Sequence, residues 1–434
     1  MATGISSLHE VRAVKNWRAC DPRRQHQLAS ELTGWLATTP AADPIAVTVV
    51  IPDETRPLRP GFILPPILGA IAEAGARRGT TINATILVAT GLHRSPKADW
   101  LKELDLTLAP FRQDPAVRLE RRVHSTSVPD AKKLPLHPLV MPRHLGGTAD
   151  RVVTVGLVEP HQYAGFSGGS KALTIGCGSS LTINSLHCLN MLRADGVTIG
   201  CVSENPFRTE VDRLAGIFAA PTFTVALVPD PTSPGEMAGV FAGASDRPFN
   251  AAVKMAREIL LAPVERQFDF ALISVPATKS KSFYQASRAL TYLALHQSPC
   301  VRRGGTLVLQ ARCIEGYGSG KGEQAFKQAL SKGTRQLLEE LVDPDKLEED
   351  PPGGAQRAYV LAMAAAKYRC VLVGAEPLPE AQGSGLTQVA DLSEVKLVGA
   401  GLVVNNPFVL MPYHKTHDRG EALDPLVELS DRSP

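Results

Sequence analysis

A carboxylate, a hydroxyl and a guanidinium crowd together where the first strongly apolar run of the chain ends. Asp53 and Arg56 follow residues 45–51, with Thr55 between them. An arginine can bind a carboxylate or a phosphate through two parallel hydrogen bonds, so this segment could hold an anionic ligand. A turn capped by Asp53 and closed by an ion pair with Arg56 explains the same residues equally well.

A histidine follows the next apolar run. His93 lies in the segment Gly-Leu-His-Arg, directly after residues 83–89. An imidazole changes its charge near neutral pH, which makes it a suitable general base. Taken alone, a surface histidine in a loop is the simpler interpretation.

The richest polar segment is EPHQYAGFSGGSK, which spans residues 159–171. Glycines in such a loop let backbone N–H groups approach an anion closely. His161, Lys171 and His187 fall within 27 residues of one another. A phosphate cradle with a lysine and two histidines predicts a cofactor site. The cradle residues are Gly165, Ser167, Gly168 and Gly169.

The elements that must position these residues alternate between strand and helix. Apolar runs rich in β-branched residues predict strands at 45–51, 83–89, 152–158, 222–228, 268–275, 305–310 and 369–373. Helical patterns cover 63–75, with Gly75 as the stop, and also 284–296 and 327–340. This alternation predicts an α/β fold with largely parallel, Rossmann-like sheets. The three polar segments then lie at carboxyl ends of strands, where ligands bind in such sheets.

Chain length favours more than one domain. We expect an N-terminal cofactor-binding α/β domain over 1–264 and a C-terminal α/β domain over 265–402, with an active-site cleft between them. The tail from about 403 to 434 looks irregular and could pack back on the first domain.

Composition narrows the class of protein. The 434 residues carry a formal net charge of +3, from 46 basic and 43 acidic side chains. This near-balance argues against a nucleic-acid binder. Seven cysteines without a CxxC pair fit a reducing compartment. With neither a signal peptide nor an apolar run of membrane-spanning length, the sequence predicts a cytoplasmic protein without a membrane partner.

Together, the segments DETRP, GLHR and EPHQYAGFSGGSK and the later His187 resemble the nickel-pincer lactate racemase family, the LarA-like 2-hydroxyacid racemases and epimerases. The resemblance implies a nickel-pincer nucleotide, the nickel complex of pyridinium-3,5-bisthiocarboxylic acid mononucleotide, linked covalently to Lys171. It implies His187 as the protein ligand of nickel, and His93 and His161 as two bases on opposite faces of the substrate. Proteins that build this cofactor are then expected partners.

The same resemblance assigns the remaining positions. Asp53 and Arg56 would lie beside the cofactor, and Arg56 would also contact the substrate. In the second half of the chain, Tyr284 and Gln285 would face the active site. Arg288 stands where the lactate enzyme has lysine, and it would contact the substrate too. With Lys279 and Lys281 nearby, this change could suit a second carboxylate, as in malate.

The implied reaction is racemisation or epimerisation of a 2-hydroxy acid by hydride abstraction and return, through a 2-keto acid. This route avoids direct removal of the weakly acidic proton beside a carboxylate. An epimerase of a sugar acid or longer hydroxy acid, and a non-catalytic nucleotide- or metal-binding homologue, remain alternatives. The sequence leaves open which hydroxy acid is used, its chirality and whether the chain forms a homo-oligomer.

Overall fold

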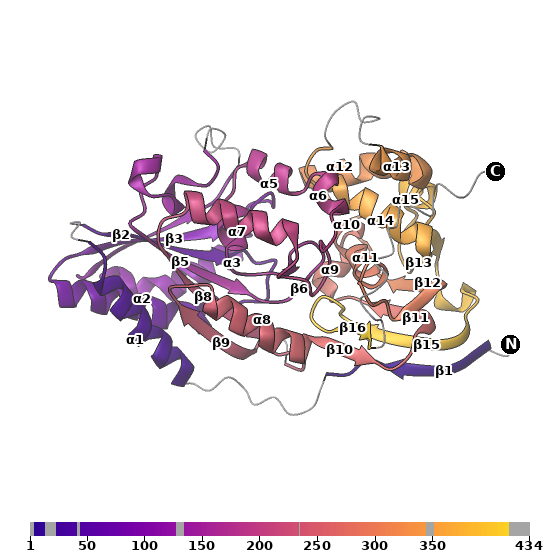
Figure 1. The fold of residues 1–434 in the computed structure, drawn as a ribbon, viewed down its shortest axis with the longest axis horizontal. Helices are drawn as coiled ribbons and strands as arrows, with labels where there is room; N and C mark the ends of the chain where they lie inside the picture. The colour runs from indigo at the N-terminus through magenta and orange to yellow at the C-terminus, as the bar shows by residue number, and fades with distance from the viewer. Residues whose placement is uncertain are drawn as a thin grey trace.

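The computed structural model describes residues 4–13, 23–40, 44–126, 134–233, 235–343 and 351–415. Two six-stranded sheets dominate it. The first sheet occupies the left half of Figure 1 and the second sheet the right half.

The first sheet has the strand order of a doubly wound fold. Its strands are, in spatial order, β4 (Val117–Val123), β3 (Ile82–Ala89), β2 (Ala46–Pro52), β5 (Arg151–Leu157), β8 (Thr222–Pro229) and β9 (Met237–Gly243). All neighbours are parallel except β8 and β9. The central strands are nearly continuous apolar runs because both of their faces are buried.

Helices cover both faces of the first sheet, with α1 and α2 below it and α7 above it in Figure 1. The long helices are α1 (Arg23–Ala37), α2 (Pro60–Arg78), α3 (Ala98–Leu108), α7 (Pro206–Phe218) and α8 (Arg247–Leu260). Shorter ones are α4 (Lys171–Thr174), α5 (Ser180–Leu186) and α6 (Leu189–Arg193).

The second sheet is parallel throughout. Its strands are, in spatial order, β1 (Gly4–Glu10), β15 (Val398–Asn405), β11 (Phe268–Ser274), β12 (Val301–Gln310), β13 (Arg369–Val373) and β14 (Thr387–Val389). Its helices are α9 (Ala277–Ser280), α10 (Phe283–Ala286), α11 (Arg288–Ala294), α12 (Lys321–Leu330), α13 (Gly333–Val342), α14 (Gln356–Lys367) and α15 (Pro379–Gly383). An α/β architecture with large parallel sheets is therefore confirmed.

The N-terminal strand β1 belongs to the second sheet, beside β15, as the indigo and yellow arrows in Figure 1 show. A small parallel pair joins β10 (Leu261–Val264) to β16 (Met411–His414). The tail is thus not irregular over 403–415, since it contains the end of β15 and all of β16; residues 416–434 lie outside the described residues. The division into 1–264 and 265–402 remains a prediction.

Each predicted strand is present. The largest difference between predicted and observed bounds is in β12, which begins at Val301 and not at residue 305. The added residues include a bulge in which Gly304 has a φ of 77°. The predicted stop at Gly75 is wrong. Helix α2 continues to Gly79, a left-handed cap with φ 65°. Gly75 lies inside the helix. The position favours glycine because a Cβ there would lie only 2.7 Å from the carbonyl oxygen of Ala116.

Two predicted helices are each divided into two. The pattern over 284–296 forms α10 and α11, separated at Ser287, whose hydroxyl bonds to the Tyr284 carbonyl at 3.4 Å. The pattern over 327–340 forms α12 and α13. The second helix begins at Gly333, whose φ of 77° interrupts a continuous helix.

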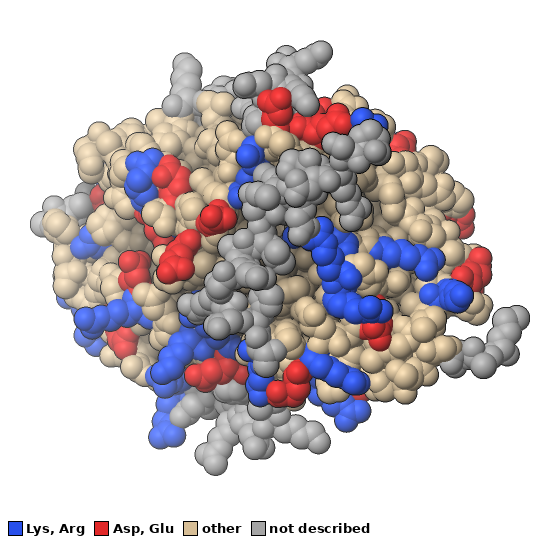
Figure 2. All heavy atoms as spheres, turned by 45° about the vertical axis from the view of Figure 1, so that its right-hand side comes forward, with Lys and Arg blue, Asp and Glu red and all other residues tan. Residues whose placement is uncertain are grey.

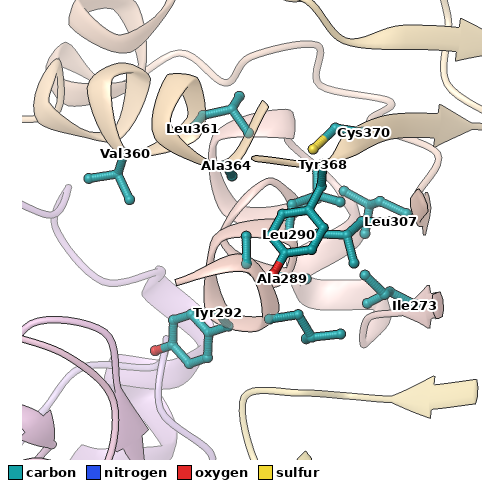
Figure 3. Packing of buried hydrophobic residues seen from close by; sticks show 14 of the residues in the cluster. Ile273, Ala289, Leu290, Tyr292, Leu307, Val360, Leu361, Ala364, Tyr368 and Cys370 are labelled. Carbon is teal, nitrogen blue, oxygen red and sulfur yellow. The ribbon is translucent and has the colours of Figure 1, made fainter. Parts of the chain in front are cut away.

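A large apolar cluster lies between the second sheet and its helices, and Figure 3 shows part of it. Tyr292 lies at its border, with the hydroxyl pointing toward the first half of the chain. That hydroxyl donates to the carbonyl of Pro160 at 3.2 Å. Packing of the second sheet thereby reaches the loop that follows β5.

Acidic and basic side chains stand next to one another at several places on the face in Figure 2, in keeping with the near-balanced charge. Within the described ranges, no helix is both long enough and apolar enough to cross a membrane.

Candidate active site

The candidate site forms at the carboxyl edge of the first sheet. Strands β2 and β5 are neighbours there, and the connections run outward in opposite directions from them, to β3 and to β8. In doubly wound sheets this reversal opens a crevice for ligands. The polar segments after β2, β3 and β5 all end at this edge, as the sequence predicts.

Asp53 and His93 form a pair across two strand ends. His93 Nδ1 lies 2.8 Å from Asp53 Oδ2. The other carboxylate oxygen accepts hydrogen bonds from the Thr55 amide at 3.0 Å and hydroxyl at 2.5 Å. Burial acts to raise the pKa of Asp53, but the hydrogen bond to His93 and its charge outweigh it and hold the pKa at about 2. Asp53 is therefore an anion that orients His93 and leaves its Nε2 facing outward.

Arg56 does not pair with Asp53 as the alternative turn would require. Its Nη1 lies 3.8 Å from Oε2 of Glu159, two residues beyond the end of β5. Burial raises the pKa of Glu159, while the charges of Arg56 and Lys279 oppose this rise. Glu159 is a residue that the sequence analysis left without a role, and its burial is not visible from the sequence.

The glycine-rich loop is a tight turn built on β6 (Pro160–His161) and β7 (Gly165–Phe166). Gly165, Gly168 and Gly169 have φ of 71°, 84° and 62°. A Cβ on Gly165 would collide with the carbonyl of Cys201. Ser167 donates to Leu157 O at 2.6 Å, so its hydroxyl supports the loop itself.

Arg208 stabilises this loop through hydrogen bonds to its backbone. The sequence analysis did not predict this residue. It lies on α7 with its side chain 2% exposed. Its guanidinium donates to the carbonyls of Gly168 at 3.1 Å and Ala164 at 3.4 Å, and also to that of Phe166. It stacks on the ring of Phe249 at 4.6 Å. One buried guanidinium thus holds three carbonyls of the loop.

Two histidines and a tyrosine form a continuous row of rings. The Tyr163 ring lies 5.8 Å from that of His161 and 5.6 Å from that of His187. His161 Nδ1 accepts from the amides of Tyr163 and Ala164, both at 3.2 Å. The neutral ring therefore carries its proton on Nε2. Burial first, and then the charges of Lys171 and neighbouring arginines, lowers the pKa of His161 well below its usual value.

Lys171 begins α4 and completes the cluster. Burial lowers its pKa well below the usual value for lysine, and the charges of Arg56 and Arg208 lower it further. An amine without its proton is a nucleophile, so Lys171 is suited to forming a covalent bond.

Side chains from the second sheet close the site. Thr291 Oγ1 donates to Gln162 Oε1 at 3.0 Å, and Lys279 Nζ donates to Thr55 O at 3.4 Å. Arg288 is 9% exposed and bonds to Tyr292 Oη at 2.9 Å. Tyr284 packs face to face with the guanidinium of Arg357. Like Arg208, Arg357 was not predicted from the sequence.

Comparisons with known proteins show similarity to lactate racemases. Residues 38–105 and 137–200 match the family described as the lactate racemase N-terminal domain. The lactate racemase of Thermoanaerobacterium thermosaccharolyticum is 23% identical over 374 residues, which cover 83% of this chain and 81% of that protein. The lactate racemase of Lactiplantibacillus plantarum is 24% identical over 317 residues, covering 70% of this chain and 68% of that protein.

The chain thus contains a lactate racemase N-terminal domain and is similar to LarA-like lactate racemases over most of its length.

Solved structures share the fold of this LarA-like chain. The lactate racemase apoprotein from T. thermosaccharolyticum has a TM-score of 0.71 at 20% identity, covering 94% of this chain and 95% of that one. A structural-genomics structure of a Thermotoga maritima protein has a TM-score of 0.66 at 14% identity, covering 92% of this chain and 100% of that one.

The LarA-like site fits the nickel-pincer nucleotide that the resemblance implies. His187 Nδ1 donates to Ile183 O at 2.8 Å, which leaves the Nε2 lone pair free for a metal. Burial lowers the pKa of His187 to about 4, so the ring is neutral as a ligand must be. Among the described residues no group of three histidines, cysteines or carboxylates could hold a metal ion.

Two residues of the LarA-like site carry buried polar atoms without a partner. The Tyr163 hydroxyl and Gln285 Oε1 are both fully enclosed and unpaired. Unpaired buried polar atoms are rare in native proteins and point to a ligand. Gln285 was predicted to face the substrate. Tyr163 was missed as a site residue, although it stands inside the motif at residues 159–171.

Proposed function

We propose that this chain is a racemase or epimerase of a 2-hydroxy acid that uses a nickel-pincer nucleotide linked to Lys171. The observation that carries the proposal is the grouping of three residues: His161 and His187 flank the Tyr163 ring, and the charge of Lys171 acts on both histidines. The names of the two lactate racemases related to this chain support a racemase acting on lactate or a similar hydroxy acid.

The cofactor site combines an attachment point, a metal ligand and a cradle. Lys171 would be the attachment point because burial lowers the pKa of its amine well below the usual value for lysine, which favours a nucleophilic amine. His187 would hold the metal through Nε2, and the loop around Gly165, Gly168 and Gly169 would hold the phosphate. Neutral imidazole and sulfur donors suit nickel. When bound, the group supplies the acceptor and donor of hydride that inversion at a C–H carbon requires.

His93 is proposed as the group that takes the hydroxyl proton of the substrate, at Nε2. Its Nδ1 is tied to Asp53, and the imidazolium that forms is stabilised by that carboxylate. Arg56 would bind the substrate carboxylate from the same strand end, and Arg288 from the second sheet.

His161 is proposed as the counterpart of His93 on the opposite side of the substrate. Because Nδ1 accepts two backbone N–H groups, the resting ring meets the substrate oxygen as a hydrogen-bond donor through Nε2. It can take up a proton only if the ring releases those two groups. The two histidines therefore start in complementary states, one accepting and one donating.

The test is to express the chain together with cofactor-building proteins and to measure intact mass and nickel content. We expect a mass adduct on Lys171, about one nickel per chain, and interconversion of enantiomers of a 2-hydroxy acid. Lys171→Met is the control and should carry no adduct. Loaded protein that racemises no hydroxy acid would refute the proposed function.

Variants of the two histidines test the proton scheme. His93→Ala and His161→Ala should each abolish racemisation while the adduct remains. His161→Gln keeps an N–H donor and should retain more activity than His161→Ala. Full activity in either alanine variant would contradict the scheme.

A further inference from the structure

Three cationic side chains enter the site from helices packed on the second sheet. Lys279 lies on α9, Arg288 begins α11 and Arg357 lies on α14. The Arg357 guanidinium lies 3.6 Å from the centre of the Tyr284 ring, and its Nη1 donates to the Tyr284 carbonyl at 2.9 Å. Arg288 lies between the rings of Tyr292 and Phe408, at 5.5 Å and 5.2 Å.

None of these three cations forms an ion pair with a carboxylate in the part of the chain that the structure describes. Lys279 Nζ has the Thr55 carbonyl as its hydrogen-bond partner, and the two arginines have neutral oxygens. Buried charges are normally paired, and among the described residues the carboxylate that acts on Lys279 and Arg288 is that of Glu159. The described part of the site therefore holds more positive than negative charge.

The neighbouring positive charges help to lower the pKa values of Lys279 and Arg357. Burial first, and then repulsion by Arg288 and Arg56, lowers the pKa of Lys279 to about 7, although Glu159 opposes the fall. Burial also lowers the pKa of Arg357, and Arg288 adds to this. Lys279, Arg288 and Arg357 therefore repel one another, and Glu159 offsets part of this repulsion at Lys279.

An unpaired polar atom marks the same space. The Tyr163 hydroxyl is buried without a partner, and the charged groups acting on it are those of Arg357 and Arg288. A ligand that neutralises these arginines could also accept from this hydroxyl. The position is beside His161 and His187, where the substrate is proposed to react.

The proposed cofactor and a monoanionic substrate leave part of this charge unexplained. The cofactor would lie against Lys171 and the glycine-rich loop of the first sheet. One substrate carboxylate is satisfied by Arg56 and Arg288. Lys279 and Arg357 then remain, and neither lies on the loop that would hold the cofactor.

We infer that Lys279 and Arg357 bind a second anionic group of the substrate, so that the preferred substrate is a 2-hydroxy acid with two carboxylates. This inference rests on the proposed function and narrows its substrate class. Lactate, with one carboxylate and a methyl group, would leave both cations unpaired.

The test compares 2-hydroxysuccinate (malate) with lactate on the cofactor-loaded protein and on the chain without cofactor. Calorimetry gives the dissociation constants, and a chiral assay gives kcat/KM for each acid. We expect malate to bind at least about 10-fold more tightly than lactate and to have the higher kcat/KM, because each removed charge–carboxylate pair weakens binding substantially.

The variants are Lys279→Gln and Arg357→Gln, with Lys281→Gln as the matched control. Each of the first two should lower malate affinity by about 10- to 100-fold more than lactate affinity. The sequence analysis grouped Lys281 with Lys279, but Lys281 is not among the charges that act on Glu159, Lys279 or Arg357. Lys281→Gln removes the same charge two positions from Lys279 and should leave the ratio as it is. Arg357→Lys should recover part of the preference, which separates charge from loss of packing on Tyr284.

The outcomes distinguish this inference from the proposed function. Equal binding of malate and lactate, or variants that do not change the ratio of their affinities, would overturn the inference. Racemisation of lactate in the same experiment would still support the proposed function. Absence of racemisation on any acid would refute the function, and the binding ratio would still decide the inference. Loss of the Lys171 adduct in Lys279→Gln or Arg357→Gln would assign these residues to the cofactor and overturn it as well.

Discussion

Replacing Asp53 by asparagine removes the charge that supports His93 while keeping a side chain of nearly the same shape. The fall of the Asp53 pKa from 3.8 to about 2 corresponds to about 2 kcal/mol of preference for the ionised form. Solvent screens part of this interaction because the His93 side chain is 41% exposed. The imidazolium of His93 should therefore lose between about 1 and 2 kcal/mol of support, or a 5- to 30-fold loss of rate at neutral pH.

The assay is kcat/KM for racemisation by the cofactor-loaded protein, with urea unfolding as a second measurement. Glu54→Gln is the matched control, because Glu54 Oε1 accepts from the Lys97 amide and does not contact His93. An Asp53→Asn variant within twofold of the natural protein would refute the reasoning. So would an equal loss of rate in Glu54→Gln.

The pH dependence of Asp53→Asn has a defined sign. The pKa of Asp53 is lower in the folded chain than its ordinary value of 3.8, so its stabilising effect is complete above that value. It is lost as the pH falls from about 4 toward 2. The difference in unfolding free energy between Asp53→Asn and the natural protein should be equal at pH 7 and 5 and begin to shrink near pH 4.

Three further variants test the parts of the site. Arg208→Met should lower the unfolding free energy by about 3 kcal/mol in urea titrations, because three buried carbonyls lose their donor; a change below 1 kcal/mol would contradict this. His187→Ala should reduce nickel per chain by at least about 10-fold while the Lys171 adduct persists in the intact mass; undiminished nickel would exclude His187 as the ligand. Gly165→Ala should destabilise the fold by more than about 1 kcal/mol, since φ is 71° and the added Cβ collides with a carbonyl. Gly34→Ala, in an open helical position, should not destabilise it.

The strands that the sequence predicts are those whose both faces are buried. β2 reads AVTVVIP and leaves little choice of structure. The edge strand β4 escaped the prediction because most of its side chains are polar. β4 reads VRLERRV, and its Arg121 pairs with Asp105 at 3.0 Å on the helix before it. β1 pairs with β15, which lies almost four hundred residues away in the sequence. A local sequence pattern cannot predict a pairing over that distance.

The same reasoning explains which site residues were found. The residues after β2, β3 and β5 stand in short motifs, and strand ends of one parallel sheet meet without further information. Arg208 and Arg357 are single basic residues on helices, and this pattern usually marks a solvated surface. Only packing on Phe249 and on Tyr284 buries them. The sequence contains their identity but not the neighbours that give them a role.

The groups proposed to carry out the reaction and those proposed to select the substrate come from different sheets. The proposed proton-transfer, attachment and metal-binding groups all lie on the first sheet and its loops. The cations that face them from Lys279 and Arg357 lie on helices of the second sheet. Because hydrogen bonds such as Lys279 to Thr55 and Tyr292 to Pro160 hold the two halves together, each half positions the other. Arg357 bonds instead to Tyr284 of its own half. If the proposed substrate site is right, an Arg357 substitution should change which hydroxy acid fits while leaving the His93, His161 and Lys171 geometry in place.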